Sequence, residues 1–314
     1  MINRERPRKR VALLVETSTS WGSDVIRGVA EFAKAHGPWQ FFIEPRGKRE
    51  RLLLPEAWEG DGVIARVTHE ALAAQLIELK IPAVNVSWYE YGLGAIPQCS
   101  ADAVKAAHIS ADYFLDRGYR HFAYCPSNRR PNFVDRYGHA FVEYLKERGF
   151  TVHLFQGSEL EERNWQQEMN ALRRWVAMLP KPIGMLTFED VRGRQLTEAC
   201  QLEGVPVPDE VAVLGGEYDQ LSAEISSPKL SSLDHSGIRV GYRAAEILAE
   251  MMSAGGRPVR KQTWLPPAGV ITRQSTDTLA IEDSYVAAAV KYIGEHACEP
   301  IQVTDVLKHI GSIS

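Results

Sequence analysis

The sequence is poor in cysteine, and the few cysteines are scattered. Cys99, Cys125, Cys200 and Cys298 are the only four in 314 residues, and none forms a C-x-x-C pair. Disulfide frameworks and structural zinc sites depend on closer, repeated spacings. We therefore expect reduced thiols, each buried as a small hydrophobic side chain, in a cytoplasmic protein without a metal site.

Long apolar runs are also missing. The apolar run that follows the basic residues 4–10 extends only over Val11–Val15, which is too short for the apolar region of a secretory signal. No stretch approaches the roughly 20 apolar residues that cross a membrane. We expect a chain that has no membrane partner and stays in the cytoplasm.

The sequence has no large excess of either charge. Lysine and arginine number 36 and aspartate and glutamate 40, so the formal net charge is -4. Such a balance gives no general attraction to nucleic acid. Any contact with DNA must therefore come from a local patch of the surface.

Motifs that carry catalysis are absent from the sequence. It contains no G-x-G-x-x-G, no G-x-x-x-x-G-K-[ST], no G-x-S-x-G and no H-E-x-x-H, and its nine histidines are dispersed. We predict no catalytic residues, no cofactor and no enzyme activity. A sugar-modifying α/β enzyme stays open as an alternative. So does a transport-type sugar-binding protein, against which the missing signal sequence argues.

The sequence does contain a regular alternation of short apolar runs and amphipathic segments. Val11–Val15 is typical of a strand buried on both faces of a parallel sheet. Residues 16–23 predict a polar loop, and residues 24–35 have apolar side chains at helical spacing. Repetition of this unit predicts a parallel, doubly wound sheet.

The alternation is interrupted once and then restarts, which predicts two lobes. Residues 126–134 are polar and rich in proline, as in a loop or a crossing between lobes. The predicted fold class is α/β, with two doubly wound parallel-sheet lobes. We assign residues 8–125 and 236–262 to the N-lobe, and residues 126–235 and 263–275 to the C-lobe.

Residues 276–314 differ in character and predict a short helical segment. Asp283 or Ser284 can cap a first helix, and Thr304 can cap a second helix with Val306, Leu307 and Ile310 directed inward.

Three segments of the second half resemble a known family. Residues 205–219, with the sequence VPVPDEVAVLGGEYD, resemble a segment of the lactose and galactose repressor cores. Residues 227–234 and 240–245 resemble the proline-led strand and the returning helix of the same cores. The resemblance implies a fold of the periplasmic-binding-protein type, in which a sugar binds between the lobes.

The C-terminal segment resembles a second family. Tyr292-Ile293 and residues 301–311 are similar to the opening of an arabinose-activator-type helix-turn-helix domain. A sugar core followed by this type of domain is the arrangement of the bacterial xylose operon regulators. The resemblance implies a homodimeric transcription regulator that binds D-xylose or a related pentose. It would bind operator DNA through the complete C-terminal domain. Residues 312–314 are too few to form the recognition helix of that domain, so we expect no specific operator binding by this chain.

The ends of the predicted strands in the N-lobe provide candidate sugar ligands. A sugar site needs carboxylates, amides or arginine beside an aromatic platform, and such groups gather where parallel strands end. The candidates are Glu16, Trp21, Asp24, Arg66 and Asp102. Trp21 can stack on a sugar or fill the core, and Asp102 can contact ligand or cap a helix.

Candidates in the C-lobe come from the resemblance. The family has an arginine near a helix start, an acidic or amide pair after a strand, an aspartate in a glycine-led loop and a glutamine near the lobe crossing. The corresponding residues are Arg136, Glu189, Asp190, Glu217 and His235. Tyr137 is an alternative to Arg136, and Glu217 and His235 depart from the usual aspartate and glutamine. We expect Asp190 and Glu217 to be loop residues that face the crevice, the alternative being solvated loop carboxylates.

Overall fold

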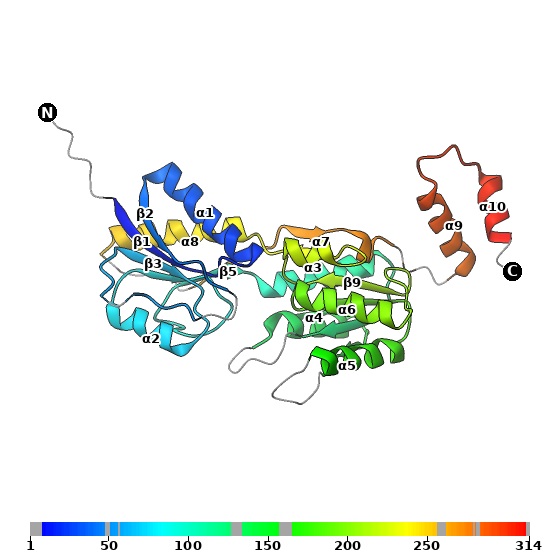
Figure 1. Cartoon of the computed structure of the whole chain (residues 1–314), viewed down its shortest axis with the longest axis horizontal. Helices are drawn as coiled ribbons and strands as arrows, with labels where there is room; N and C mark the ends of the chain where they lie inside the picture. The colour runs from blue at the N-terminus through cyan, green and yellow to red at the C-terminus, as the bar shows by residue number, and fades with distance from the viewer. Residues whose placement is uncertain are drawn as a thin grey trace.

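The chain folds into two α/β lobes followed by a pair of helices (Figure 1). The computed structural model describes residues 8–47, 51–55, 57–126, 134–156, 165–255, 262–278, 280 and 283–311. Each lobe has a six-stranded sheet, with strand orders β11-β5-β4-β3-β1-β2 and β12-β10-β9-β8-β6-β7. The predicted fold class is confirmed.

The first lobe is built on a fully parallel sheet. Its strands are β1 (Lys9–Leu14), β2 (Trp39–Ile43), β3 (Gly62–Ala65), β4 (Ala83–Asn85), β5 (Gln98–Ala101) and β11 (Gln262–Leu265). Helices α1 (Ser20–His36) and α8 (Gly237–Ser253) pack in the core cluster on one face, and α2 (Glu70–Leu79) packs in the cluster on the other. The inner strands β1, β3, β4 and β5 are buried over most of their length, as expected for a parallel sheet covered by helices on both faces.

Two glycines let α1 and α8 approach closely. A Cβ atom at Gly28 would lie 2.0 Å from the carbonyl oxygen of Ile238, and one at Gly241 would lie 1.9 Å from that of Val25. Any side chain at either position would force the helices apart. This contact fixes the N-terminal end of α1, which lies at the crevice between the lobes.

The second lobe has the same layered design with one antiparallel edge. Its strands are β6 (His121–Cys125), β7 (Val152–Leu154), β8 (Ile183–Thr187), β9 (Val211–Gly215), β10 (Ser231–Asp234) and β12 (Gly269–Ile271), of which β12 is antiparallel to β10. Its helices are α3 (Ala103–Asp116), α4 (Arg136–Lys146), α5 (Trp165–Met178), α6 (Asp190–Leu202), α7 (Gln220–Ile225) and a short 3₁₀ turn, η1 (Gln274–Thr276). Helices α3 and α4 cover one face, and α5 and α6 the other.

The chain crosses between the lobes at places that differ from the predicted boundaries. The first crossing is at Asp102, because α3 packs against α4 and β6 lies inside the second sheet. Residues 103–125 were therefore wrongly assigned to the N-lobe. Residues 263–265 were wrongly assigned to the C-lobe, because β11 pairs with β5. Short apolar strands look alike in sequence, so their pattern does not say which sheet they join.

The three crossings run close together and form the hinge. The backbone N–H of Asp102 donates to the carbonyl of Leu265 at 2.7 Å, and that of Ala268 donates to the carbonyl of Asp234 at 2.8 Å. Of the proline-rich segment expected to be a crossing, residues 127–133 lie outside the described residues. The hinge thus consists of Asp102, the 235–236 junction and residues 266–268.

The C-terminal helices agree with the prediction in number but not in every detail. They are α9 (Ser284–Glu295) and α10 (Val303–Gly311), and Asp283 caps α9 by accepting from the N–H groups of Tyr285 and Val286. Thr304 lies inside α10 rather than at its cap. Leu307 is 60% exposed rather than inward, because this helix pair has little of its own core. Residues 312–314 lie outside the described part of the chain.

Two further predictions from composition can be compared with the structure. Cys99, Cys125 and Cys200 are buried as expected, whereas Cys298 is exposed in the turn after α9. No helix among the described residues combines the length and apolar character needed to span a membrane.

Candidate ligand-binding crevice

A pocket lies between the lobes, at the carboxyl ends of strands from both sheets. Its lining includes Trp21, Arg66, Trp88, Phe188, Glu217 and His235, and we call it the central pocket. Arg66 follows β3 and the segment with Trp88 follows β4, whereas Phe188, Glu217 and His235 follow β8, β9 and β10. This is the edge where ligands bind to open α/β sheets, because the strands end there and the loops are exposed to the crevice.

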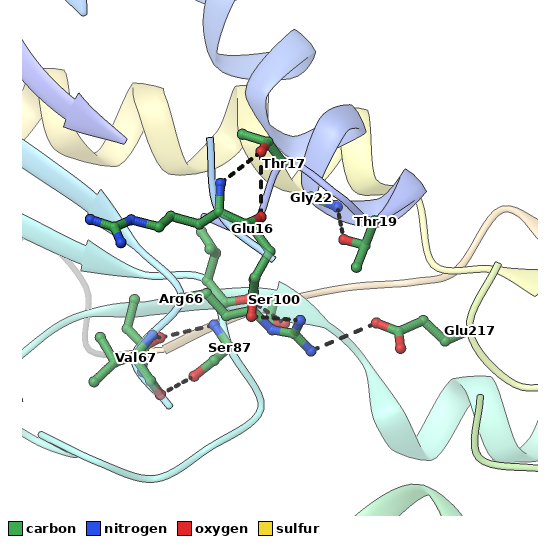
Figure 2. A network of polar contacts seen from close by, with 12 residues as sticks. Glu16, Thr17, Thr19, Gly22, Arg66, Val67, Ser87, Ser100 and Glu217 are labelled. Carbon is green, nitrogen blue, oxygen red and sulfur yellow. Dashed lines mark hydrogen bonds and ion pairs between the residues drawn. The ribbon is translucent and has the colours of Figure 1, made fainter. Parts of the chain in front are cut away.

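Arg66 is the centre of the polar contacts in this pocket. One guanidinium nitrogen lies 3.3 Å from Glu16 of the same lobe, and the other lies 3.7 Å from Glu217 of the second lobe. Figure 2 shows the side chain extending between these two carboxylates. The guanidinium also lies over the indole ring of Trp21, 5.0 Å from the ring centroid. Arg66 therefore links the lobes directly.

The two carboxylates keep Arg66 charged although it is buried. Burial by itself would lower the pKa of the guanidinium, but the charges of Glu16 and Glu217 outweigh it and raise the pKa above its usual value. A planar guanidinium donates in two directions at once, which suits a position between two acceptors.

A second polar network holds the loops that carry Arg66 and Trp88. The side-chain oxygen of Asn85 accepts from the N–H groups of Val67 at 3.2 Å and Ser87 at 2.9 Å. The hydroxyl of Ser87 donates to the carbonyl of Val67 at 2.9 Å, as Figure 2 shows. The backbones of the loops after β3 and β4 are thus tied to each other.

Trp88 is the main aromatic wall of the crevice. Its indole N–H donates to the carbonyl of Ala101 at 2.8 Å. Its ring meets His235 edge-on at a centroid distance of 4.9 Å and Phe188 at 6.0 Å. Sequence analysis missed both Trp88 and Phe188. Their signal was their position, which is also that of Arg66: each lies at or just after the end of a predicted strand.

Trp88 also lines a second pocket, which we call the side pocket. Its other lining residues include Asp102, Val134, Arg136, Tyr137 and Trp264. The central pocket has a cavity volume of about 30 Å³ and the side pocket one of about 130 Å³. Both fall below the roughly 300 to 1,000 Å³ of typical ligand pockets. Side chains such as Arg66 and Trp88 therefore occupy most of the crevice.

His235 is buried at the hinge, where β10 ends. Its Nε2 contacts the carbonyl oxygen of Gly216, and its ring packs against Trp88 and Tyr137. Burial lowers the pKa of the imidazole, and the Gly216 contact and the charges of Glu217 and Asp234 offset only part of this effect. The ring is therefore neutral at neutral pH.

Asp190 has a different role from the one predicted. It is the first residue of α6 rather than a loop residue, it is 1% exposed, and it does not line the central pocket. Its carboxylate accepts from the N–H of Asp219 at 2.9 Å and from the hydroxyl of Ser232 at 2.6 Å. Burial raises its pKa well above the usual value despite these bonds. Asp190 thus anchors the segment that carries Glu217.

Glu189 and Asp24 are also absent from the lining of the central pocket. Glu189 occupies the N-cap position of α6 without a side-chain cap bond, and it is half-buried. The predicted loop ended at Ser23 and the predicted helix began at Asp24, but α1 begins at Ser20, so Trp21 as well as Asp24 lies on the helix. There Asp24 forms an ion pair with Arg27 at 3.0 Å. The cause is Thr19, which caps the helix four residues earlier than predicted by accepting from the N–H of Gly22.

The remaining candidates belong to the side pocket. Asp102 caps α3 by accepting from the N–H groups of Val104 and Lys105, so the capping interpretation is confirmed. Arg136 forms an ion pair with Glu90, and its side chain is 49% exposed. The alternative residue, Tyr137, is buried with its hydroxyl 2.8 Å from that of Ser110. The structure therefore gathers Glu16, Trp21, Arg66, Glu217 and His235 in and around the central pocket, and separates them from the other candidates.

Comparisons with known proteins agree with this architecture. The profile of the periplasmic binding protein-like domain matches residues 111–276, and that of the XylR N-terminal domain matches residues 10–94. The xylose operon regulatory protein of Escherichia coli K12 is 29% identical over 97% of this chain and 79% of its own length. That of Haemophilus influenzae is 25% identical over 96% and 79%.

A solved structure extends the likeness to three dimensions. The structure of a xylose-binding transcription activator matches with a TM-score of 0.77 and 28% identity, covering 97% of this chain and 79% of the other. These relatives are named as transcription regulators and not as enzymes, in agreement with the prediction. The periplasmic binding protein-like profile covers more than half of the sequence. The chain therefore belongs to the periplasmic binding protein-like family and is similar to its xylose operon regulators.

Proposed function

We propose that this chain is a D-xylose-responsive transcription regulator of the cytoplasm that binds its sugar between the two lobes. One observation carries the proposal: charged, hydrogen-bonding and aromatic side chains of both lobes meet in the central pocket. The similarity to xylose operon regulators over nearly the whole chain supports a pentose as the ligand.

In this proposal the sugar takes the place of direct contacts between the lobes. Trp21, Trp88 and Phe188 can pack against the faces of a sugar ring, and Arg66 and Glu217 can bond its hydroxyls from opposite sides. The small cavity volumes mean that Arg66 and Trp88 must shift when a pentose enters. A ligand that contacts both lobes favours their closed arrangement, which is a shift of population.

The helix pair at the C-terminus would transmit this change to DNA. Helices α9 and α10 lie beyond the second lobe (Figure 1) and contact each other through the stacked rings of Tyr292 and His309, 4.7 Å apart. We assign them to the start of a helix-turn-helix domain. In a homodimer, lobe closure would alter the spacing of two such domains and so their fit to an operator.

The proposal is tested by the effect of sugars on thermal unfolding and by calorimetry. D-xylose at a hundred times its dissociation constant should stabilise the folded chain by about 2.7 kcal/mol. Aldohexoses and other pentoses at the same concentration serve as matched controls for specificity. A melting temperature that no sugar changes would contradict the proposal and favour the enzyme alternative.

A further inference from the structure

Two buried side chains at the crevice have an acceptor atom that is not used by the protein. Oε2 of Glu16 and Nδ1 of His235 are both inaccessible to solvent and have no hydrogen-bond partner in the described part of the chain. Each residue is only 3% exposed. A buried polar atom without a partner costs free energy, so such atoms indicate where a ligand or water completes the bonding.

The contacts of His235 determine which of its nitrogens can accept. A carbonyl oxygen can only accept, so the contact with Gly216 requires the hydrogen to be on Nε2. In the neutral ring this leaves Nδ1 with a lone pair and no hydrogen. The free nitrogen of His235 can therefore bind only a donor, whereas a glutamine at this position could also have bound an acceptor.

The charges around the central pocket also favour a hydrogen-bond donor over an anion. Among the described residues that line this pocket, Arg66 is the only cation, and its guanidinium already faces Glu16 and Glu217. Within the described part of the chain, two carboxylates against one guanidinium leave an excess of negative charge. Asp234 adds to it, because its charge acts on both His235 and Asp24.

The side pocket does not compensate for this excess. Among the lining residues that the structure describes, Arg136 is the one cation of the side pocket, and it is paired with Glu90. Asp102, on the same pocket, uses its carboxylate to cap α3. A phosphate or a carboxylate in the crevice would thus meet carboxylates, and no described lining residue offers an uncommitted cation to balance it.

We infer that the crevice selects a neutral sugar whose hydroxyls donate to Glu16, Glu217 and His235, and that it excludes anionic derivatives of that sugar. The inference rests on the proposed function, since it assumes a sugar ligand. The sensor would then report the free sugar before phosphorylation or oxidation makes it anionic. At a separation of roughly 6 Å and an effective dielectric constant near 20, one unit of like charge lowers affinity about a hundredfold.

The test compares ligands that share a ring but differ in charge. D-xylose, methyl α-D-xyloside and α-D-xylose 1-phosphate are titrated calorimetrically into the full chain. The methyl glycoside has a substituent at the same position without the charge, so it measures the steric effect. We expect the phosphate to bind about a hundredfold more weakly than the methyl glycoside. Binding of the phosphate within about threefold of the methyl glycoside would overturn the inference.

Charge variants separate electrostatic exclusion from steric exclusion. Glu217→Gln removes one negative charge at the crevice and should reduce the difference between phosphate and methyl glycoside to within about threefold. Asp209→Asn removes the same charge before β9, at the opposite end of the strand that Glu217 follows, and should leave the difference unchanged. A difference that Glu217→Gln does not reduce would overturn the inference. Failure of every neutral sugar to bind the unmodified chain would contradict the proposed function instead.

Discussion

The two lobes share one architecture but contribute different chemistry to the crevice between them. The first lobe supplies the guanidinium of Arg66, with Glu16 beside it and Trp21 beneath it. The second lobe supplies Glu217, and the adjacent hinge supplies the acceptor nitrogen of His235. The cation is thus in the first lobe, and acceptors lie on both sides of it. A ligand that both donates and accepts, as a sugar hydroxyl does, can satisfy the two lobes together.

The lobes also differ in how these groups are held. In the first lobe Asn85 and Ser87 bind the loops to each other. In the second lobe the buried carboxylate of Asp190 holds the backbone of Asp219, two residues after Glu217. The following substitutions test which of these residues contribute to stability and which contribute to sugar affinity.

The largest loss of stability is expected from Arg66→Ala in the first lobe. It leaves Glu16 buried without its cation, and removal of one partner of a buried ion pair costs about 3 to 5 kcal/mol. Chemical denaturation should show this loss together with loss of D-xylose binding. Arg27→Ala is the control, because that ion pair with Asp24 involves an arginine side chain that is 69% exposed. Equal stability of Arg66→Ala and the unmodified chain would contradict the role of the pair.

In the second lobe, Asp190→Ala should also act on stability first. It leaves the N–H of Asp219 and the hydroxyl of Ser232 without their acceptor, at roughly 1 to 3 kcal/mol for each buried group. Because the N–H of Asp219 is only partly buried, denaturation should show a loss in the lower part of the summed range of about 2 to 6 kcal/mol, about 2 to 4 kcal/mol. An unchanged midpoint would mean that Asp190 is the solvated or ligand-facing loop residue that the sequence suggested.

Glu217→Ala should instead lower sugar affinity and leave stability nearly unchanged. A charge-assisted bond to a sugar hydroxyl contributes roughly 1.5 to 3 kcal/mol, so D-xylose affinity should fall about ten- to a hundredfold. The melting temperature should change little, because Glu217 is in a loop after β9. Asp209→Ala, before the same strand, is the control and should bind like the unmodified chain. Undiminished binding by Glu217→Ala would place the sugar elsewhere.

His235 should make stability depend on pH in the acidic range. Its pKa is lowered in the folded chain from 6.5, so below about pH 6.5 the unfolded chain takes up a proton that the folded chain does not. The stabilisation is thus present above pH 6.5 and is lost as the pH falls toward the folded pKa. Urea denaturation between pH 8 and pH 5 should show a steeper decline for the unmodified chain than for His235→Gln. Parallel curves would show that His235 is not held neutral.

The smallest effect is expected where the lobes touch outside the central pocket. The hydroxyl of Ser20 in α1 donates to Asp219 at 3.3 Å and accepts from the N–H of Gln220 at 2.9 Å, which joins the two lobes. Ser20→Ala should lower sugar affinity by about two- to tenfold, as expected for two partly exposed hydrogen bonds that favour closure. The control is Ser23→Ala, whose hydroxyl donates within the first lobe to Thr17. Equal affinities of the two variants would show that this contact does not favour closure.

The fold could be predicted from the sequence because its apolar residues follow two patterns. Short apolar runs such as Val11–Val15 indicate buried strands, and apolar residues at helical spacing indicate the helices between them. The side chains after strand ends could be predicted as well, as Arg66 shows. The role of Asp190 could not, because its partners Asp219 and Ser232 are 29 and 42 residues away in the sequence. Trp21 was wrongly placed in a loop because Thr19 ended the loop earlier than the hydrophobic pattern indicated.

The most direct test of the account is a crystal structure of this chain grown with D-xylose. The account predicts one pentose beside Trp21 and Trp88, with hydroxyls bonded both to Arg66 of the first lobe and to Glu217 of the second. A pentose held by one lobe alone, or bound away from the crevice, would contradict it.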